Sequence, residues 1–512
     1  MKKQLSSDNN DIISPGEVGE VDNEILKPEL TKEVDKAFGL AIETEGIQLD
    51  PAKEKKLVRK IDWYILSTMC ALMSCQLMGK SSNSYASIIG LREDLHMTSK
   101  EYSWVGSGFY LGYLVFEYPA SLILQRFPMS KVLAFAVIAW GVVLCCHGAC
   151  KSSATFLLCR TLLGILQSFM DPAYMIMTSQ WYRKEEQYIR CAYWLGMQGF
   201  GTLLGSGIAY GFYTHQGSFS MRPWSLLYIV VGVITIFFGL ISYTHVPDIP
   251  TKAWFLNEEE KSYVVERIRQ NRTGFGNPKF KWSQLKEAVI DPTIYLFFLF
   301  MFGYGYSNGA LGNYGSIILE EYLDFSTGQS LLMNMVGSGM DIVFPLMFAY
   351  INKYFIKSRL IVAFIINAVV WAGLFMLAYS SNRGARTFGY FITYWQTASW
   401  ATLSSIVQTN VAGYTKRSTA NTLFLVGFSV GNLLGPLSYS YNNNEDLDYT
   451  AAGASMIGTN ALSVFSPPVL FVIYYFRNKK KINLEKGDLG DDNQLSFGDL
   501  TDYENPAFRY DL

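Results

Sequence analysis

The chain has 512 residues, of which 50% are hydrophobic and 15% aromatic, while only 17% are charged. Soluble proteins usually carry about 25% charged residues, so this composition argues against an ordinary water-soluble protein. The net charge of −1 implies no bulk attraction to nucleic acid, and neither a metal-ligand spacing nor a cofactor motif is found.

Apolar stretches recur along almost the whole chain, and each is long enough to cross the hydrocarbon core of a bilayer as one helix. The sequence therefore predicts an all-α, multi-pass membrane protein. We place twelve spans at residues 61–79, 103–125, 131–150, 154–177, 191–213, 225–245, 293–319, 331–350, 360–380, 387–411, 418–437 and 453–476.

Positive charges predict the orientation of these spans. Lys and Arg gather before the first span, after the last span and in alternate loops, which places both termini in the cytoplasm. Residues 1–60 contain no apolar signal-peptide core, so the first span is expected to direct insertion. The one N-x-[ST] sequon, at Asn271, falls in a loop that this topology keeps inside the cell, where glycosylation does not occur.

A polar central segment divides the spans into six and six. Within it, residues 257–270 are expected to form a short amphipathic helix capped by Asn257. Two six-helix halves joined by a cytoplasmic loop are the arrangement of the major facilitator fold, in which the halves rock around a midplane site. The predicted organisation is an acidic N-terminal tail at 1–60, a first half at 61–246, a cytoplasmic loop at 247–291, a second half at 292–476 and a cytoplasmic tail at 477–512.

Two cations inside the predicted spans are candidate substrate ligands, because ionisable groups in a bilayer are costly and each needs a reason. Arg160 lies about two turns into the fourth span, where a guanidinium can grip a carboxylate with two hydrogen bonds. Alternatively, Arg160 has a structural role and pairs with a helix carbonyl or with Asp171. Lys80, at the end of the first span, is either a second cation for the substrate or a lysine that extends to the membrane surface.

Two carboxyl groups are candidates for proton coupling. Asp341, near the middle of the eighth span, can take and release a proton during a transport cycle, or it has one permanent partner. Glu117 precedes Tyr118 and Pro119 in the second span, where proline permits a bend, so it is either a gate residue or part of an interhelical pair. Gln396 in the tenth span is expected either to line a cavity or to make an interhelical hydrogen bond.

Two other patterns bear on mechanism. The pairs Gly201/Gly205 and Gly431/Gly435 predict close helix contacts. No ATP-hydrolysing machinery is found, since the sequence before Lys80 lacks the upstream glycine of a phosphate-binding loop. Any uphill transport would therefore be driven by an ion gradient.

Several motifs resemble those of a known family. Residues 160–164 (RTLLG) resemble the fourth-span signature of major facilitators, and residues 109–119 (FYLGYLVFEYP), 181–190 and 246–256 resemble its anion:cation symporter branch. Residues 90–97 (GLREDLHM), 102–114 and 271–277 and the tail at 497–510 (FGDLTDYENPAFRY) are similar to the fungal allantoate permease group.

This resemblance implies proton-driven uptake of a small organic anion across a fungal plasma membrane. Substrates of the group include allantoate, ureidosuccinate and small peptides, and relatives carry vitamins or sulfur-containing acids. The group often has Asp-Lys where this chain has Gly79-Lys80, and Glu where this chain has Gln167. We therefore count Gln167 among the substrate-binding candidates, expect Asp341 to carry more of the proton work, and expect a substrate other than allantoate.

Three alternatives stay open at this point: an efflux carrier for drugs or metabolites, a non-transporting nutrient sensor, and a facilitator without proton coupling. Residues 199–207 (GFGTLLGSG) lack the Gly-Pro motif typical of antiporters in this superfamily, which favours uptake. The C-terminal tail is either a trafficking signal, with a compact turn at 505–508, or a plain disordered tail. Lysines in the first 60 residues are expected to be accessible to ubiquitin machinery.

Overall fold

The computed structural model describes residues 51–269, 281–440, 449–484, 500–505 and 508–512. The sequon at Asn271 and the lysines of the first 50 residues lie outside this range. Within it, the regular structure is helical throughout and no strand is present, as the sequence predicts.

The first half contains the helices between Pro51 and His245. Its first helix begins at Pro51, ten residues before the predicted span, so part of the expected tail is helical. The elements are α2 (Pro51–Ile61), η1 (Asp62–Leu66), α3 (Ser67–Ala86), η2 (Ser87–Leu91), α4 (Arg92–Asp94), α5 (Ser99–Arg126), α6 (Met129–His147), α7 (Ser153–Gln167), α8 (Met170–Trp181), α9 (Lys184–Thr214) and α10 (Pro223–His245).

The second half follows a linker that has three short helical elements of its own. The linker contains η3 (Pro250–Lys252), α11 (Glu258–Arg269) and α12 (Trp282–Ile290). The second half contains α13 (Pro292–Ile317), η4 (Ile318–Tyr322), α14 (Thr327–Tyr354), α15 (Arg359–Tyr379), α16 (Arg383–Ile392), η5 (Thr393–Trp395), α17 (Gln396–Asn410), α18 (Tyr414–Leu434), η6 (Pro436–Ser440) and α19 (Tyr449–Leu484).

Helices lie at all twelve predicted span positions, but they differ in how apolar they are. Among the described residues, seven helical spans are long and apolar enough by themselves to cross a membrane. The pair α12 and α13, bent by 65° where Pro292 follows Asp291, raises this number to eight. Other predicted spans, such as α3 and α17, carry many Ser, Thr and Asn residues. The count of twelve membrane crossings therefore stays a prediction.

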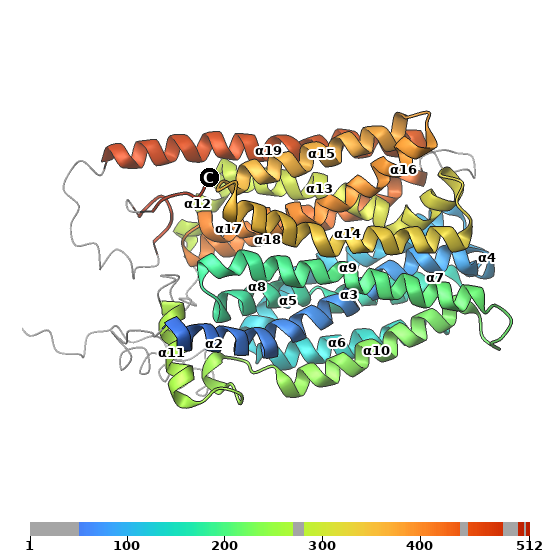
Figure 1. Cartoon of the computed structure of the whole chain (residues 1–512), viewed down its shortest axis with the longest axis horizontal. Coiled ribbons are helices and arrows are strands. Elements are labelled where there is room, and N and C mark those ends of the chain that lie inside the picture. The colour runs from blue at the N-terminus through green and yellow to red at the C-terminus, as the bar shows by residue number, and fades with distance from the viewer. Residues whose placement is uncertain (1–50, 270–280, 441–448, 485–499, 506–507) are drawn as a thin grey trace, which may run out of the picture.

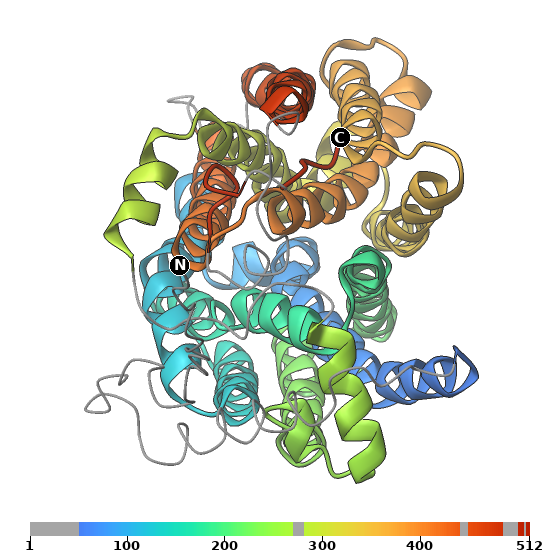
Figure 2. The same cartoon turned by 90° about the vertical axis from the view of Figure 1, so that its left-hand side faces the viewer.

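The two halves lie side by side, with all long helices running roughly parallel to one axis (Figures 1 and 2). Helix α9 of the first half packs against α14 of the second half, and α5 packs against α18. We call the end of the bundle that carries α11 and α12 the linker end, and the end that carries α4 the opposite end (Figure 1).

Local sequence signals fix several helix starts. Thr98 and Glu101 form a reciprocal capping box at the start of α5, in which the Glu101 N–H donates to Thr98 Oγ1 at 3.2 Å. At the start of α11, the Glu260 N–H donates to Asn257 Oδ1 at 2.8 Å, which confirms the predicted cap. Such side chains satisfy backbone donors that have no partner within the helix.

Small residues allow the close helix contacts that the sequence predicts. A Cβ atom on Gly201 would lie 2.0 Å from the carbonyl oxygen of Ser74 on α3. A Cβ atom on Gly431 would lie 2.4 Å from the carbonyl oxygen of Phe302 on α13. Since real Cβ atoms do not approach so closely, glycine lets α9 meet α3 and lets α18 meet α13 at backbone distance.

At the opposite end, hydrogen bonds join the two halves. Asn83 Nδ2 donates to Asn313 Oδ1 at 2.6 Å, and the Tyr102 hydroxyl donates to the Asn313 carbonyl at 2.8 Å. The hydroxyls of Ser84 and Ser316 are 3.0 Å apart. These contacts are buried, so this end of the interface between the halves is closed.

Each linker helix is fastened to one half. On α11, Arg267 donates to Glu186 of α9 at 2.8 Å and to Glu54 of α2 at 2.9 Å. On α12, Gln284 Oε1 accepts from the Thr415 N–H of α18 at 2.9 Å. The linker helices therefore move with different halves if the halves move relative to each other.

The C-terminal segment is docked on the second half at the linker end. The Asp511 N–H and Asn410 Nδ2 form reciprocal hydrogen bonds of 2.8 Å, one to the side chain of Asn410 and one to the carbonyl of Asp511. The Tyr510 N–H donates to Asn478 Oδ1 at 2.9 Å. A plain disordered tail is therefore the wrong expectation for residues 500–505 and 508–512, because their backbone and side chains have partners on α17 and α19. The trafficking role stays a prediction.

A buried ion cluster holds this segment to α12 and α18. Lys416 Nζ, which has no exposed side-chain surface, lies 2.7 Å from Asp502, 2.8 Å from Glu287 and 3.0 Å from Asp291. Arg477 lies 2.8 Å from Asp291. Burial raises the pKa of Asp291, but the hydrogen bond and charge of Arg477, with Lys416, outweigh burial and lower this pKa to about 2. The Asp291 carboxylate thus stays charged, and its stabilising effect is lost only as the pH falls toward that value.

We expect Lys416→Met to destabilise the protein by about 3–5 kcal/mol, because it leaves buried carboxylates facing one another without their shared cation. The measurement is the thermal unfolding temperature of the purified protein. Lys479→Met is the control, since Lys479 lies on α19 at the same end of the bundle but is exposed. An equal, small effect of the two substitutions would contradict this assignment.

Candidate functional site

Lys80 lies between the two halves. Its Nζ is 4.9 Å from the ring centre of Tyr110 on α5 and 5.6 Å from that of Phe428 on α18. Aromatic faces attract cations, and they do so most strongly where water is excluded. The side chain therefore does not extend to the membrane surface but is held at the interface between the halves.

Arg160 lies behind Lys80, within the first half. It is 2% exposed, and its Nη2 donates to the backbone carbonyl of Lys80 at 3.4 Å. Its guanidinium also lies 6.0 Å from the ring centre of Tyr228. This is the contact with a helix carbonyl that the sequence left as an alternative to substrate binding. Asp171, the other possible partner, instead accepts a hydrogen bond from the Tyr113 hydroxyl at 2.5 Å.

Gln167 is fully buried on the same face of α7 as Arg160. Within the described part of the chain, neither its amide oxygen nor its amide nitrogen has a hydrogen-bond partner. The same holds for the Tyr110 hydroxyl and for Arg160 Nε. Buried polar groups almost always have partners, so water or a ligand is expected to supply them for these atoms.

The two candidate proton carriers have different surroundings. Asp341 Oδ1, on α14, accepts a hydrogen bond from Thr397 Oγ1 at 2.6 Å. Glu117 Oε2, on α5, accepts a long hydrogen bond of 3.4 Å from Ser429 on α18, and its Oε1 has no partner among the described residues. Glu117 thus contacts the other half, as an interhelical pair would.

Asp341 also lies at the crossing of α14 with α9. A Cβ atom on Gly199 would be 2.8 Å from Asp341 Cβ, so the carboxyl group is carried at a backbone contact between the halves. Gln396 Nε2 donates to the Tyr304 carbonyl at 2.8 Å, which is the interhelical bond that the sequence allowed as its alternative role.

The structure thus gathers the predicted residues into two groups. Lys80, Glu117, Arg160 and Gln167 belong to the first half, and Asp341 and Gln396 belong to the second. The sequence reasoning missed Tyr110 and Phe428, which flank Lys80. With 33 Tyr and 34 Phe in the chain, no local signal separates these two rings from the rest.

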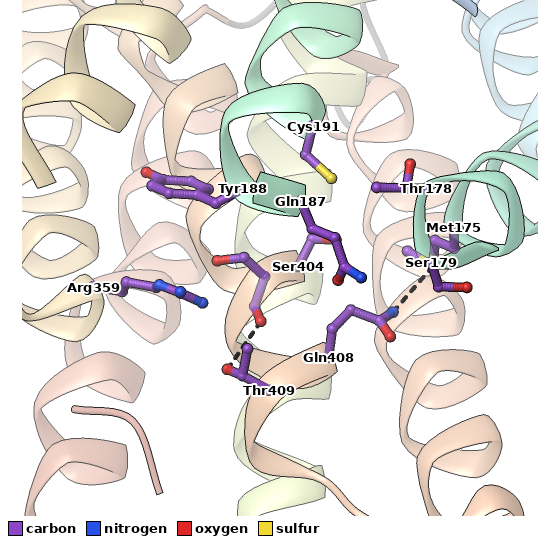
Figure 3. A pocket seen from close by; sticks show the side chains of 11 residues that line it. Met175, Thr178, Ser179, Gln187, Tyr188, Cys191, Arg359, Ser404, Gln408 and Thr409 are labelled. Carbon is purple, nitrogen blue, oxygen red and sulfur yellow. Dashed lines mark hydrogen bonds between the residues drawn. The ribbon is translucent and has the colours of Figure 1, made fainter. Parts of the chain in front are cut away.

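A cleft opens between the halves at the linker end (Figure 3). It is narrow, with about 20 Å³ of room for the centres of water-sized molecules, and it is lined by side chains of α8, α9, α15 and α17. Beside it, the hydroxyls of Tyr188 and Thr402 are 3.0 Å apart and join the two halves. The interface is therefore closed at the opposite end and partly open at the linker end.

This fold and site are those of a membrane carrier built from two halves, and the comparisons agree. The model of the Major Facilitator Superfamily matches residues 66–436, so the chain belongs to this superfamily, in a group that resembles a fungal allantoate permease. It is therefore a secondary transporter and not an enzyme.

Individual relatives extend this result. The allantoate permease of Saccharomyces cerevisiae is 36% identical over 94% of this chain and 91% of its own length. An uncharacterized transporter of Schizosaccharomyces pombe is 37% identical over 97% of this chain and 96% of its own. The structure of the proton:xylose symporter XylE bound to 6-bromo-6-deoxy-D-glucose has a TM-score of 0.62, covers 80% of this chain and 96% of its own, and is 12% identical, which bears on the fold alone.

Proposed function

We propose that this chain is a proton-coupled symporter that takes up a small organic anion across the plasma membrane, with both termini in the cytoplasm. The observation that carries the proposal is Lys80, a cation held between Tyr110 and Phe428 at the interface of the two halves. The similarity of the whole chain to an allantoate permease supports a ureido-carboxylate or a similar acid as the substrate.

The cycle has three steps. A proton binds Asp341 or Glu117, and the anion binds Lys80, next to Gln167 and with the charge of Arg160 behind it. The halves then rock so that the opposite end closes and the linker end opens, and both ligands leave there. Protonation of a carboxyl group offsets the charge of the anion, so the loaded carrier reorients at a lower electrostatic cost.

Orientation follows from charge. The positive residues before α3 and at the end of α19 lie at the linker end, and such residues favour the cytoplasmic side. The cleft in Figure 3 then faces the cytoplasm, as expected for the state that releases substrate.

The test is uptake of labelled compounds in cells that lack endogenous carriers. The panel contains allantoate, ureidosuccinate, a dipeptide, nicotinate, cysteine and a sulfonate, each offered in acidic and in neutral medium with and without an uncoupler. We expect uptake of at least one anion that is faster in acid and abolished by the uncoupler. Uptake of no anion, with the protein at the cell surface, would contradict the proposal, whereas export of a preloaded compound would favour the efflux alternative.

A further inference from the structure

Arg359 is the one charged side chain among the described residues that line the cleft at the linker end. It stands at the start of α15 and points into the cleft, whose other lining groups include Gln187, Ser404 and Gln408 (Figure 3). A guanidinium beside uncharged hydrogen-bonding side chains, at a narrow cleft that is open on one side, is suited to bind a carboxylate group.

The cleft side of this guanidinium is not saturated. Arg359 Nε lies 3.4 Å from Asp511 Oδ2, and its guanidinium carbon lies 5.6 Å from the ring centre of Tyr188. Within the described part of the chain, its two terminal nitrogens donate no hydrogen bond. Two forked N–H groups therefore remain available toward the cleft.

The C-terminal segment holds this arginine from the other side. Besides the ion pair of its side chain with Asp511, Arg359 donates a hydrogen bond from its backbone N–H to the backbone carbonyl of Leu512 at 3.1 Å. The Asp511 side chain is 39% exposed, so it is not locked away from solvent. Its carboxylate is already a partner of this guanidinium, and it partly neutralises the charge that an incoming anion would meet.

We propose that Arg359 forms a second anion-binding position, in the cleft at the linker end, and that Asp511 competes with the anion for it. A small carboxylate leaving Lys80 contacts Arg359 before it reaches solvent. The identity of that carboxylate rests on the proposed function, but the positive potential at the cleft does not.

Cys191 provides a native reporter, because its thiol lines the same cleft and is not in a disulfide. The other cysteines are replaced by alanine in the full-length protein: Cys70, Cys75, Cys145, Cys146, Cys150 and Cys159. The probes are two methanethiosulfonates of similar size, one carrying a sulfonate and one carrying a quaternary ammonium. The measured quantity is the ratio of their rates of reaction with Cys191 in purified protein.

We expect Arg359→Gln to lower the anionic-to-cationic rate ratio by about tenfold, because one positive charge is removed from a partly desolvated site. Arg359→Lys should keep most of the preference. Asp511→Asn should raise the ratio by about two- to threefold, since it removes the competing negative charge. Lys353→Gln is the matched control: it removes an exposed positive charge six residues from Arg359 that does not line the cleft, and it should leave the ratio unchanged.

An unchanged ratio in Arg359→Gln, or an equal fall in Lys353→Gln, would overturn the proposal. These reagents require no transported substrate, so the result is independent of the uptake panel. A normal charge preference without uptake of any anion would contradict the proposed function alone, and uptake with no charge preference at Cys191 would contradict the Arg359 site alone.

Discussion

Lys80→Ala is expected to lower kcat/KM for uptake of the transported anion by about 30-fold or more. Losing the partner of a desolvated charge costs about 2–5 kcal/mol, and each 1.4 kcal/mol corresponds to about a factor of ten. The ammonium group lies between the rings of Tyr110 and Phe428. Water therefore cannot easily take its place as the partner of the anion after the substitution. The measurement is initial uptake rate against substrate concentration, normalised to the amount of protein at the surface.

Two further substitutions make this result specific. Lys80→Arg keeps the charge and should retain part of the activity, although the larger guanidinium must fit between the same rings. Lys151→Ala removes an exposed lysine between α6 and α7 and should behave as the wild type. If Lys80→Ala transported at the wild-type rate, Lys80 would not be the substrate cation, and the buried Arg160 would be the remaining candidate.

Asp341→Asn is expected to abolish accumulation of the anion against its gradient, so that the ratio of internal to external concentration falls to about unity at steady state. Asparagine has nearly the same shape and can still accept the hydrogen bond of Thr397, but it cannot take up a proton. The measurement is the accumulation ratio in proteoliposomes with an imposed pH gradient.

Exchange of labelled for unlabelled anion separates coupling from folding. It needs no net proton movement, so we expect Asp341→Asn to retain it. Glu117→Gln is the comparison, because Glu117 is the other candidate carboxyl group and, among the described residues, accepts only the long bond from Ser429. We expect it to reduce accumulation less than Asp341→Asn does. Wild-type accumulation in Asp341→Asn would exclude this residue as the proton carrier.

The sequence determined the class of this protein. Repeated apolar stretches can bury their backbone only as helices in a bilayer, so the all-α fold and the division around the linker followed from composition and periodicity alone. Capping groups such as Asn257 and small residues such as Gly201 and Gly431 act through their nearest neighbours, and they were predictable for the same reason.

The tertiary structure decided which candidates face each other. Whether Lys80 extends to the membrane surface or lies between the halves depends on Tyr110 and Phe428, and these residues are 30 and 348 positions away in the chain. Arg160, a candidate substrate ligand from its position in the fourth span, contacts the backbone of α3. Side-chain direction within a helix is set by packing against other helices, which hydrophobic periodicity does not encode.

The C-terminal segment gives the clearest case of this difference. Its composition is polar and resembles that of a disordered tail. The structure nevertheless buries Asp502 and Tyr510, because residues distant in sequence pack against them. Lys416 of α18 pairs with Asp502, and Asn478 of α19 accepts a hydrogen bond from the Tyr510 backbone N–H. The amino-acid sequence alone was enough to predict a helical carrier of two halves. Only the packing of those halves decided where its charges meet, because charges far apart in sequence interact only after the helices are assembled.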